Sequence, residues 1–271
     1  MKISNIIKTI VALIIAAVHF LPIYIAIVLA LKPKTDSSSR WLLPKQLYLE
    51  NFTRAIENAH IFTAVKNSVI ITLVTVFLVI LIGGMAAYPL ARNKIKFNKY
   101  ILILIIGVMM VPPLSIIVPL LTMFSRIGAV STYWGIILVN TTYLLPLSIF
   151  LYTKFISTIP VSLDEAATID GCSKFSVFFR IILPLLKPVT TTVAILTGVA
   201  VWNEYQFALY LIQAPKKRVV TLAVASFFGI QSLYLGAAAA TAIIAILPIL
   251  ILYVFLQKYF VEGVSLTGMK G

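Results

Sequence analysis

Six long runs of apolar residues dominate the sequence, and their length limits what the chain can fold into. A helix that crosses the hydrocarbon core of a bilayer needs about 20 apolar residues. In hydrocarbon every backbone amide must be paired internally, so each run is expected to form a helix. Alternation at period two is absent, which argues against a barrel. The six candidate spans cover residues 10–31, 67–90, 100–124, 133–155, 188–212 and 236–257.

The composition supports a membrane protein. Only 11% of the 271 residues are charged and 61% are hydrophobic, whereas a soluble domain carries about 25% charged residues. The net charge of +14 would suggest a nucleic-acid partner in a soluble protein. Here the basic residues form no stripe and no nucleic-acid-binding motif is present, so we assign the charge to anionic lipid headgroups and expect no nucleic-acid partner.

Motifs for a chemical site are missing from the sequence. The single cysteine, Cys172, excludes a disulfide within the chain, and His19 and His60 have no partner at metal-ligand spacing. The sequence contains no phosphate-binding loop, zinc-peptidase motif or nucleophile elbow. We therefore expect no catalytic residue, bound cofactor or metal in this chain, and no enzyme activity.

Basic residues in short loops indicate the orientation of the spans. Six spans place both ends on one side, and the dense cluster ARNKIKFNK lies in a tight loop, which puts both termini in the cytoplasm. The first run is too long for a typical signal core and lacks a small-residue cleavage site, so we interpret it as a retained anchor. The expected parts are an N-terminal transmembrane helix (1–31), an extracytoplasmic loop (32–66), a core transmembrane domain (67–258) with a loop at 160–187, and a cytoplasmic tail (259–271).

The segment between the fourth and fifth runs has a regular polar pattern, PVSLDEAATIDG followed by CSKFSVFFRIILP. Ser162 and Glu165 have the S-x-x-E spacing of a capping box, which predicts a helix that Ser162 caps. Asp164 adds negative charge in the first turn, where the helix dipole favours it. The helix should end near Asp170, with Gly171 in the left-handed turn that glycine permits.

A second short helix is expected directly after this turn. Ser173 can cap a helix over residues 174–183, and Pro184 and Pro188 then interrupt the chain before the fifth run. The small side chains of two adjacent alanines in the first helix would let another protein approach closely, which favours a docking element. An amphipathic connector that lies on the lipid headgroups explains the residues equally well.

This segment resembles the EAA loop of ATP-binding-cassette importer permeases at every defined position. The matching residues are Glu165, Ala166 and Ala167, then Gly171, then Ile181, Leu183 and Pro184. In that family two short coupling helices between spans four and five insert into a cleft of a separate ATPase subunit. The resemblance implies that Glu165 faces basic or polar groups of the ATPase and that Gly171 provides the turn. It implies an ATPase-coupling role for Glu165, Ala166, Ala167, Asp170, Gly171, Leu183 and Pro184.

Most of the chain from Asn67 onward resembles one branch of this family, the second permease of maltose and multiple-sugar importers. The similarity includes the segment WNEY in the fifth run and the tail LQKYFVEGVSLTGMKG. The resemblance implies four kinds of partner: a second homologous permease, an ATPase dimer that holds ATP and Mg, an extracytoplasmic sugar-binding protein and membrane lipid. It also implies that Met269, Lys270 and Gly271 in the tail contact the ATPase.

Glu204 is the one acid inside a predicted span, roughly 24 Å along the fifth helix if that helix is continuous from residue 188. With Trp202, Asn203 and Tyr205 it supplies the hydrogen-bonding groups and aromatic faces that hold sugars. Asn140 and Tyr143 in the fourth run are second candidates for the substrate path. The alternatives are interfacial anchoring of the aromatic residues, pairing of Glu204 with a basic residue at the outer rim, and hydrogen bonding between helices.

Prolines and small residues in the apolar runs support two further predictions. Pro112 and Pro113 free backbone carbonyls and should bend the third run. Gly83 and Gly84, and the small residues at 236–240, should allow close helix contact within the subunit or against a partner.

The sequence therefore predicts an all-α polytopic membrane protein with six transmembrane helices and cytoplasmic coupling helices between spans four and five. We expect a permease subunit of an ATP-driven sugar importer in a prokaryotic plasma membrane. The alternatives are a permease of the same type for a non-sugar solute and a secondary transporter, although the inverted repeat or midplane charges of the latter are not visible. A membrane enzyme that acts on lipids would need a polar cluster at the end of a span, and none is visible.

Overall fold

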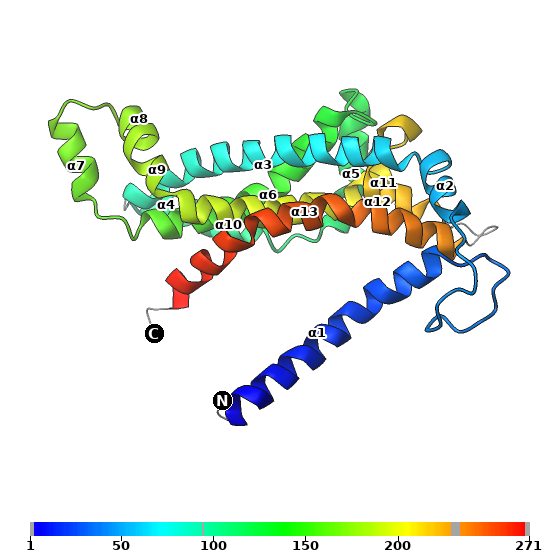
Figure 1. The fold of residues 1–271 in the computed structure, drawn as a ribbon. Coiled ribbons are helices and arrows are strands. Elements are labelled where there is room, and N and C mark those ends of the chain that lie inside the picture. The colour runs from blue at the N-terminus through cyan, green and yellow to red at the C-terminus, as the bar shows by residue number, and fades with distance from the viewer. Residues whose placement is uncertain (1–2, 94, 229–233, 269–271) are drawn as a thin grey trace. The chain divides into compact units, whose positions relative to one another are not determined.

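The computed structural model of the chain describes residues 3–93, 95–228 and 234–268, and these residues form helices joined by connections that include a long loop at 31–49 (Figure 1). The helices are α1 (Ile3–Ala30), α2 (Glu50–Glu57), α3 (Ile61–Arg92), α4 (Lys96–Val108), α5 (Pro113–Arg126), α6 (Tyr133–Ile156), α7 (Ser162–Ile169), α8 (Lys174–Val177), the π-helical segment η1 (Phe178–Ile182), α9 (Leu183–Leu185), α10 (Lys187–Trp202), α11 (Gln206–Leu211), the 3₁₀ turn η2 (Pro215–Lys217), α12 (Val220–Ala225) and α13 (Leu235–Gly268).

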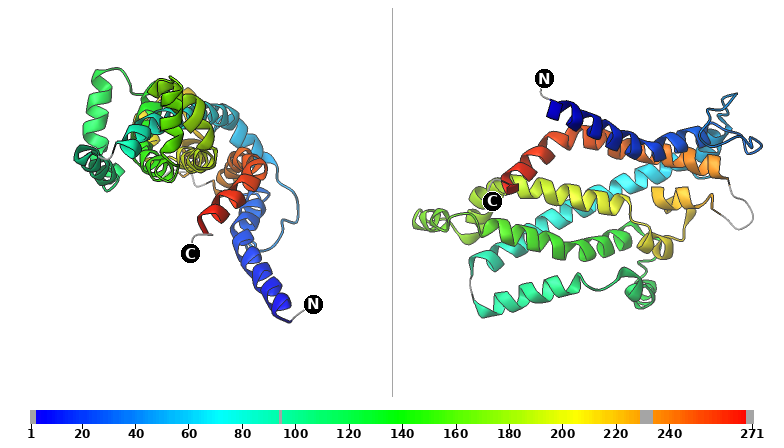
Figure 2. Two further views of the ribbon diagram at one scale, coloured as in Figure 1. Left: turned by 90° about the vertical axis from the view of Figure 1, so that its left-hand side faces the viewer. Right: turned by 90° about the horizontal axis from the view of Figure 1, so that it is seen from below.

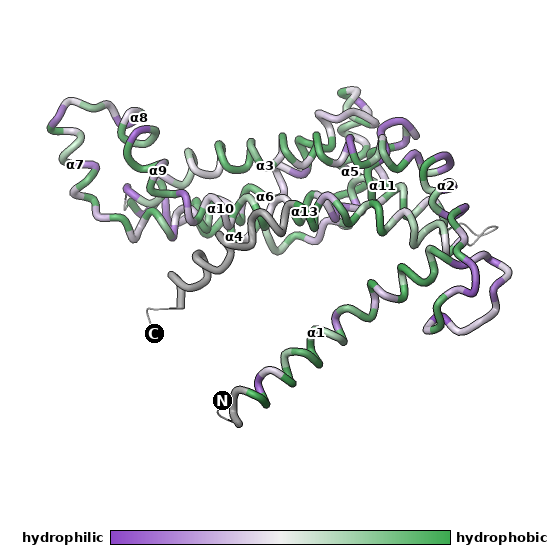
Figure 3. The backbone as a smooth tube through the Cα atoms, in the orientation of Figure 1, coloured by the Kyte–Doolittle hydropathy of each residue, from purple (hydrophilic) through white to green (hydrophobic). Residues whose placement is uncertain are grey.

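Three of these helices, α1, α3 and α6, are long and apolar enough to cross a membrane. Figure 3 shows hydrophobic residues along most of the length of α1 and α3. Two bent pairs also qualify if each pair is taken as one span, which brings the number to five within the part of the chain that the structure describes. The helix α13 has an apolar stretch at Leu235–Ile251 and continues to Gly268.

The first bent pair confirms the predicted break in the third run. The axes of α4 and α5 differ by 95°. Pro112 has an extended backbone conformation and Pro113 is the first residue of α5, as expected because a proline restricts the residue before it and cannot donate an amide hydrogen bond.

The second bent pair corrects the fifth run. A helix over residues 174–185 meets α10 at an angle of 77°, which confirms the interruption predicted around Pro184 and Pro188. The prediction of a continuous helix over 188–212 is wrong, because α10 ends at Trp202 and a separate short helix, α11, follows.

The chain divides into two compact units. The first unit contains residues 1–65 and 220–250, and the second contains residues 66–219 and 251–271. In the first unit, the Asn51 side-chain amide donates to the carbonyls of Ala30 and Lys32 at 2.9 and 2.8 Å, which holds the end of α1. A Cβ added to Gly236 would overlap Asn51. Close packing of the small residues at 236–240 is thus confirmed within this unit, where three of the alanines are buried.

The second unit is built on α3, α6 and α10, which lie side by side (Figures 1 and 2). Gly83 of α3 faces Ser148 of α6 so closely that an added Cβ would overlap the serine hydroxyl, and that hydroxyl donates to the carbonyl of Val79 at 3.2 Å. The predicted close contact at Gly83 is therefore confirmed as packing between two helices of one subunit.

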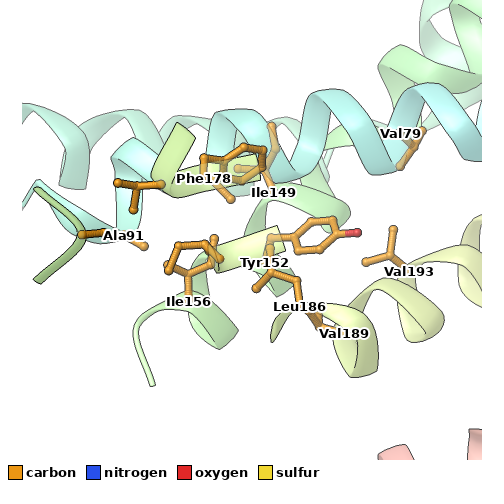
Figure 4. Close-up of a cluster of buried hydrophobic side chains, with 13 residues drawn as sticks. Val79, Ala91, Ile149, Tyr152, Ile156, Phe178, Leu186, Val189 and Val193 are labelled. Carbon is orange, nitrogen blue, oxygen red and sulfur yellow. The ribbon is translucent and has the colours of Figure 1, made fainter. Parts of the chain in front are cut away.

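One buried cluster connects these three helices with the segment after α7 (Figure 4). Tyr152 is fully buried at its centre, and its hydroxyl donates to Thr190 at 3.0 Å. The members of the cluster are Val79, Ala87, Ala91, Ile149, Tyr152, Ile156, Ala167, Val177, Phe178, Ile182, Leu186, Val189 and Val193. Because Ala167 and Phe178 belong to it, the loop at 160–187 packs onto the helices of the second unit.

Candidate functional site

Helices α7 and α8 lie at one end of the second unit, where the sequence predicts the coupling loop (Figure 1). The helix α7 exists as expected, but the predicted capping box is wrong. Val161 already has helical backbone angles, and its carbonyl accepts from the amides of Asp164 and Glu165 at 2.9 and 3.1 Å. Ser162 is therefore inside the first turn and no side-chain cap forms at Val161.

The predicted glycine turn is confirmed. α7 ends at Ile169, Asp170 follows as its C-cap, and Gly171 has a φ of +83°. The amide of Cys172 then donates to the carbonyl of Ala167 at 2.9 Å, which closes the turn. A Cβ added to Gly171 would meet no atom within 4 Å. Glycine is thus favoured here by backbone conformation and not by lack of space.

The second short helix also forms. Ser173 accepts from the amide of Ser176 at 3.3 Å, which confirms the predicted cap. The helical segment continues past Val177 as a π-helical turn and ends at Leu185, two residues beyond the predicted end. π-Helical turns inside helices are rare and are often found at functional sites.

The proposed ATPase-coupling residues divide into two groups by exposure. Ala167 is buried and belongs to the core cluster, whereas Leu183 is half-buried. The exposed members are Glu165, Ala166, Asp170, Gly171 and Pro184. Ile169 beside them is 87% exposed. The outer side of α7 and its glycine turn is therefore available to another molecule.

The inner side of α7 carries a polar network that the sequence analysis did not predict. The Arg92 guanidinium binds the Asp164 carboxylate through two hydrogen bonds of 3.2 and 2.7 Å, and the Tyr88 hydroxyl donates to the same carboxylate at 2.6 Å. The Arg92 and Asp164 side chains are only 10% and 13% exposed. From the sequence, Arg92 was expected only to set the orientation of the spans, and Asp164 only to interact with the helix dipole. The position of an arginine at the end of a span was the signal that could have indicated this pair.

Aromatic side chains surround this network. The rings of Tyr88 and Phe178 lie 5.4 Å apart, and Phe178 contacts Phe179 edge to face at 4.9 Å. A cavity of about 500 Å³ lies among these residues, with Arg92 and Lys174 in its lining. Within the part of the chain that the structure describes, no three His, Cys, Asp or Glu side chains come together as metal ligands.

Four of the predicted substrate-path residues, Trp202 to Tyr205, lie at the opposite end of the second unit, around the break between α10 and α11 (Figure 1). Asn203 follows the last residue of α10, and its side-chain amide donates to the carbonyl of Val199 at 2.9 Å. The Glu204 carboxylate accepts from the amides of Phe207 and Ala208 at 2.6 and 2.9 Å. The expectation that Glu204 lies along a continuous helix is therefore wrong: it stands in the break and caps α11, whose first amides need such an acceptor.

The other candidates differ in their exposure. Trp202 and Asn140 are buried, whereas Asn203 is exposed and Tyr143 and Tyr205 are 37% and 39% exposed. The structure brings Tyr143 of α6 next to α11, with its ring 5.6 Å from that of Phe207. Aromatic and amide groups thus remain accessible at this end of the unit.

Two further side chains hold the loop that follows α11. Asn67, near the start of α3, donates through its amide nitrogen to the carbonyls of Lys216 and Arg218 at 3.0 and 2.9 Å, and accepts from Tyr133 at 2.8 Å. The Ser131 hydroxyl accepts from the amides of Gln213 and Ala214 at 2.8 and 3.0 Å. Neither residue was predicted from the sequence to have a role. The tail residues Met269, Lys270 and Gly271 lie outside the described residues.

Known proteins with similar sequences cover nearly the whole chain. The melibiose/raffinose/stachyose import permease protein MelC of Bacillus subtilis is 44% identical over 264 residues, which are 97% of this chain and 96% of the relative. The trehalose/maltose transport system permease protein MalG of Thermococcus litoralis is 32% identical over 226 residues, 82% of this chain and 81% of the relative.

A solved structure has the same fold. A chain from the crystal structure of a bacterial ABC transporter involved in the import of the acidic polysaccharide alginate superposes with a TM-score of 0.79 and 20% identity, covering 95% of this chain and 96% of that one. Residues 79–266 match the family described as "Binding-protein-dependent transport system inner membrane component". The chain therefore belongs to this family, whose members are membrane transport components and not enzymes.

Proposed function

We propose that this chain is the permease subunit of an ATP-driven importer that moves a sugar or oligosaccharide into the cytoplasm. The observation that carries the proposal is the 44% identity over 97% of the chain to a relative named as an import permease for melibiose, raffinose and stachyose. Further relatives named for starch degradation products and for trehalose and maltose support a saccharide as the cargo.

In the proposed topology the chain crosses the membrane six times. The spans are α1, α3, the bent pair α4 and α5, then α6, α10 and α13. The three long helices, the bent pairs and the continuation of α13 to Gly268 support this count. Both termini and the loop at 160–187 then lie in the cytoplasm, in agreement with the basic residues of the tight loop after α3.

The exposed side of α7 is proposed to dock onto a separate ATPase subunit. Glu165, Ala166 and Asp170 would form that contact, with the glycine turn setting the angle to α8. The match to the EAA loop pattern and the exposed Ile169 support this role. ATP and Mg would be held by the ATPase dimer alone, and Met269, Lys270 and Gly271 would extend the contact.

A second, homologous permease and an extracytoplasmic sugar-binding protein would complete the transporter. The cargo would pass the end of the second unit that carries α11. Asn203, Tyr143 and Tyr205 are the exposed candidates for sugar contact there. Trp202 and Asn140 would act from buried positions by shaping that end, and Glu204 by holding the first turn of α11.

The test is purification of the chain with its native companions, followed by reconstitution in liposomes. We expect an assembly with two ATPase copies and one sister permease, and uptake of labelled raffinose or melibiose that needs ATP and the binding protein. An amino acid offered to the same liposomes serves as the non-sugar cargo. Uptake by the isolated chain without ATP, or ATP-driven uptake of the amino acid alone, would contradict the proposal.

A further inference from the structure

The last turn of α3 holds the coupling loop (residues 160–187) from its inner side. Tyr88 and Arg92 are four residues apart and so share one face of α3. Both bind Asp164 of α7, at 2.6 Å from the tyrosine hydroxyl and at 2.7 Å from the nearer guanidinium nitrogen. We propose that Tyr88 and Arg92 are positioning residues that transmit the movement of α7 to α3. This inference rests on the proposed function.

Arg92 also binds the chain that leads from α6 into α7. Its third nitrogen donates to the carbonyls of Ile156, the last residue of α6, and of Ile159, at 3.2 and 2.9 Å. One guanidinium thus joins the end of α3, the end of α6 and the first turn of α7. The planar group with several donors in fixed directions suits this arrangement, whereas a lysine ammonium cannot reproduce the paired contact with the carboxylate.

Tyr88 extends the same attachment to the second half of the coupling loop. While its hydroxyl donates to Asp164, its ring packs against Phe178 in the π-helical turn at 5.4 Å. The two segments on either side of Gly171 are therefore both held by a single residue of α3. Phe178 is buried in the core cluster, so this contact is fixed from the side of the helices as well.

These contacts provide a second connection in parallel with the backbone of the turn. The turn is exposed at Gly171 and is held by local backbone hydrogen bonds, such as that from the amide of Cys172 to the carbonyl of Ala167, which make no contact with α3. Through the turn alone, a push on the exposed side of α7 would pass to α8 and not directly to α3. The shielded Asp164–Arg92 pair delivers that displacement to α3 instead, because strong bonds with little water competition keep α7 on the helix.

The experiment compares Asp164→Asn with Asp164→Glu in the reconstituted complex, and measures sugar uptake, ATP hydrolysis and subunit stoichiometry in the same liposomes. We expect Asp164→Asn to assemble and hydrolyse ATP while uptake per ATP falls about tenfold, the order of one charge-assisted hydrogen bond. Asp164→Glu keeps the carboxylate and should therefore retain a higher uptake per ATP than Asp164→Asn. Tyr88→Phe, which removes a single hydroxyl, should lower the ratio less.

The matched control is Glu50→Gln, which removes the exposed pair between Glu50 and Arg54 at 3.7 Å in the first unit and should leave the ratio unchanged. A normal ratio of uptake to hydrolysis in assembled Asp164→Asn complex overturns the inference, as does an equal fall of uptake and hydrolysis that leaves the ratio unchanged. If Asp164→Asn does not assemble, Tyr88→Phe is measured in its place, and a normal ratio in that variant overturns the inference. Failure of the proposed function can be told apart from failure of this inference, because in the first case the unsubstituted complex itself would show no ATP-driven uptake.

Discussion

The two ends of α3 hold loops in similar ways but with different chemistry. At one end Asn67 donates to two loop carbonyls, and at the other Arg92 donates to the carbonyls of Ile156 and Ile159. Asn67 completes its bonding with a neutral hydroxyl, from Tyr133. Arg92 completes its bonding with a carboxylate, from Asp164.

The difference indicates which end of α3 is suited to transmit force. A neutral amide fixes the shape of a loop with bonds that are individually modest. A shielded ion pair is costly to break once formed, because each partner would be left as an uncompensated charge. The charged connection stands at the end where an ATPase is proposed to push. The neutral connections stand at the end proposed to meet cargo, where a fixed shape is what binding requires.

The largest expected loss of stability comes from removing the charge of Arg92 at the end of α3 that binds α7. Arg92→Leu should destabilise the protein by about 3 kcal/mol, because the Asp164 carboxylate is left without its charged partner in a shielded position. Thermal unfolding of the purified complex measures the loss. The double variant Arg92→Leu with Asp164→Leu should be more stable than Arg92→Leu alone. A double variant at least as unstable as the single one would show that the carbonyl contacts, and not the ion pair, dominate.

At the neutral end, Asn67→Ala should cost about 2 kcal/mol, because two carbonyls and a tyrosine hydroxyl lose their partner together. The control is Asn98→Ala. Asn98 also donates to two carbonyls, of Pro89 and Asn93, but these bonds are exposed and water can replace them. Both variants are measured by thermal unfolding. An equal loss of stability in the two would contradict the prediction that the buried hydrogen bonds of Asn67 stabilise the protein more than the exposed bonds of Asn98.

The glycine turn after α7 should affect the coupling of ATP hydrolysis to sugar transport more than it affects the stability of the protein. Gly171→Val places a β-branched residue at a φ of +83°, a conformation that costs it roughly 1 to 2 kcal/mol. Gly171→Asn should cost less, since asparagine tolerates this region. We expect the valine variant to assemble but to hydrolyse ATP with poor sugar stimulation, measured against the asparagine variant. Normal sugar-stimulated hydrolysis with valine would remove the glycine from the coupling route.

The smallest effect is expected at Glu204. Glu204→Gln keeps one side-chain oxygen as an acceptor for the first amides of α11, so the loss should stay near or below about 1 kcal/mol. The readout is hydrogen exchange in residues 206–211, which should rise while exchange in α7 stays the same. A change in α7 would mean that the two ends communicate through more than α3.

The fold was predictable where length and local backbone rules dominate. Apolar runs of spanning length gave α1, α3 and α6, and paired prolines gave the bend between α4 and α5. Gly171 was predictable for the same reason, since few residues other than glycine adopt a positive φ after a helix. These signals are local in sequence and need no knowledge of what packs against what.

The polar contacts were harder to predict because they join residues distant in sequence. Arg92 and Asp164 are separated by 72 positions, and no spacing rule connects them. The capping box at Ser162 failed because Val161 was already helical. The segment WNEY lies inside the run 188–212 that was expected to form one span, yet the Glu204 carboxylate accepts from the first amides of α11 in the break between two helices. In each case a tertiary contact or a backbone amide overrode a plausible local pattern.

The position of Cys172 has a practical consequence. It is the one cysteine in the sequence, it directly follows Gly171, and its side chain is partly accessible. A fluorophore or spin label attached to its sulfur would therefore lie at the turn without any other thiol of this chain having to be removed. The natural protein thus already has an attachment point for spectroscopy where rearrangement during the transport cycle is expected.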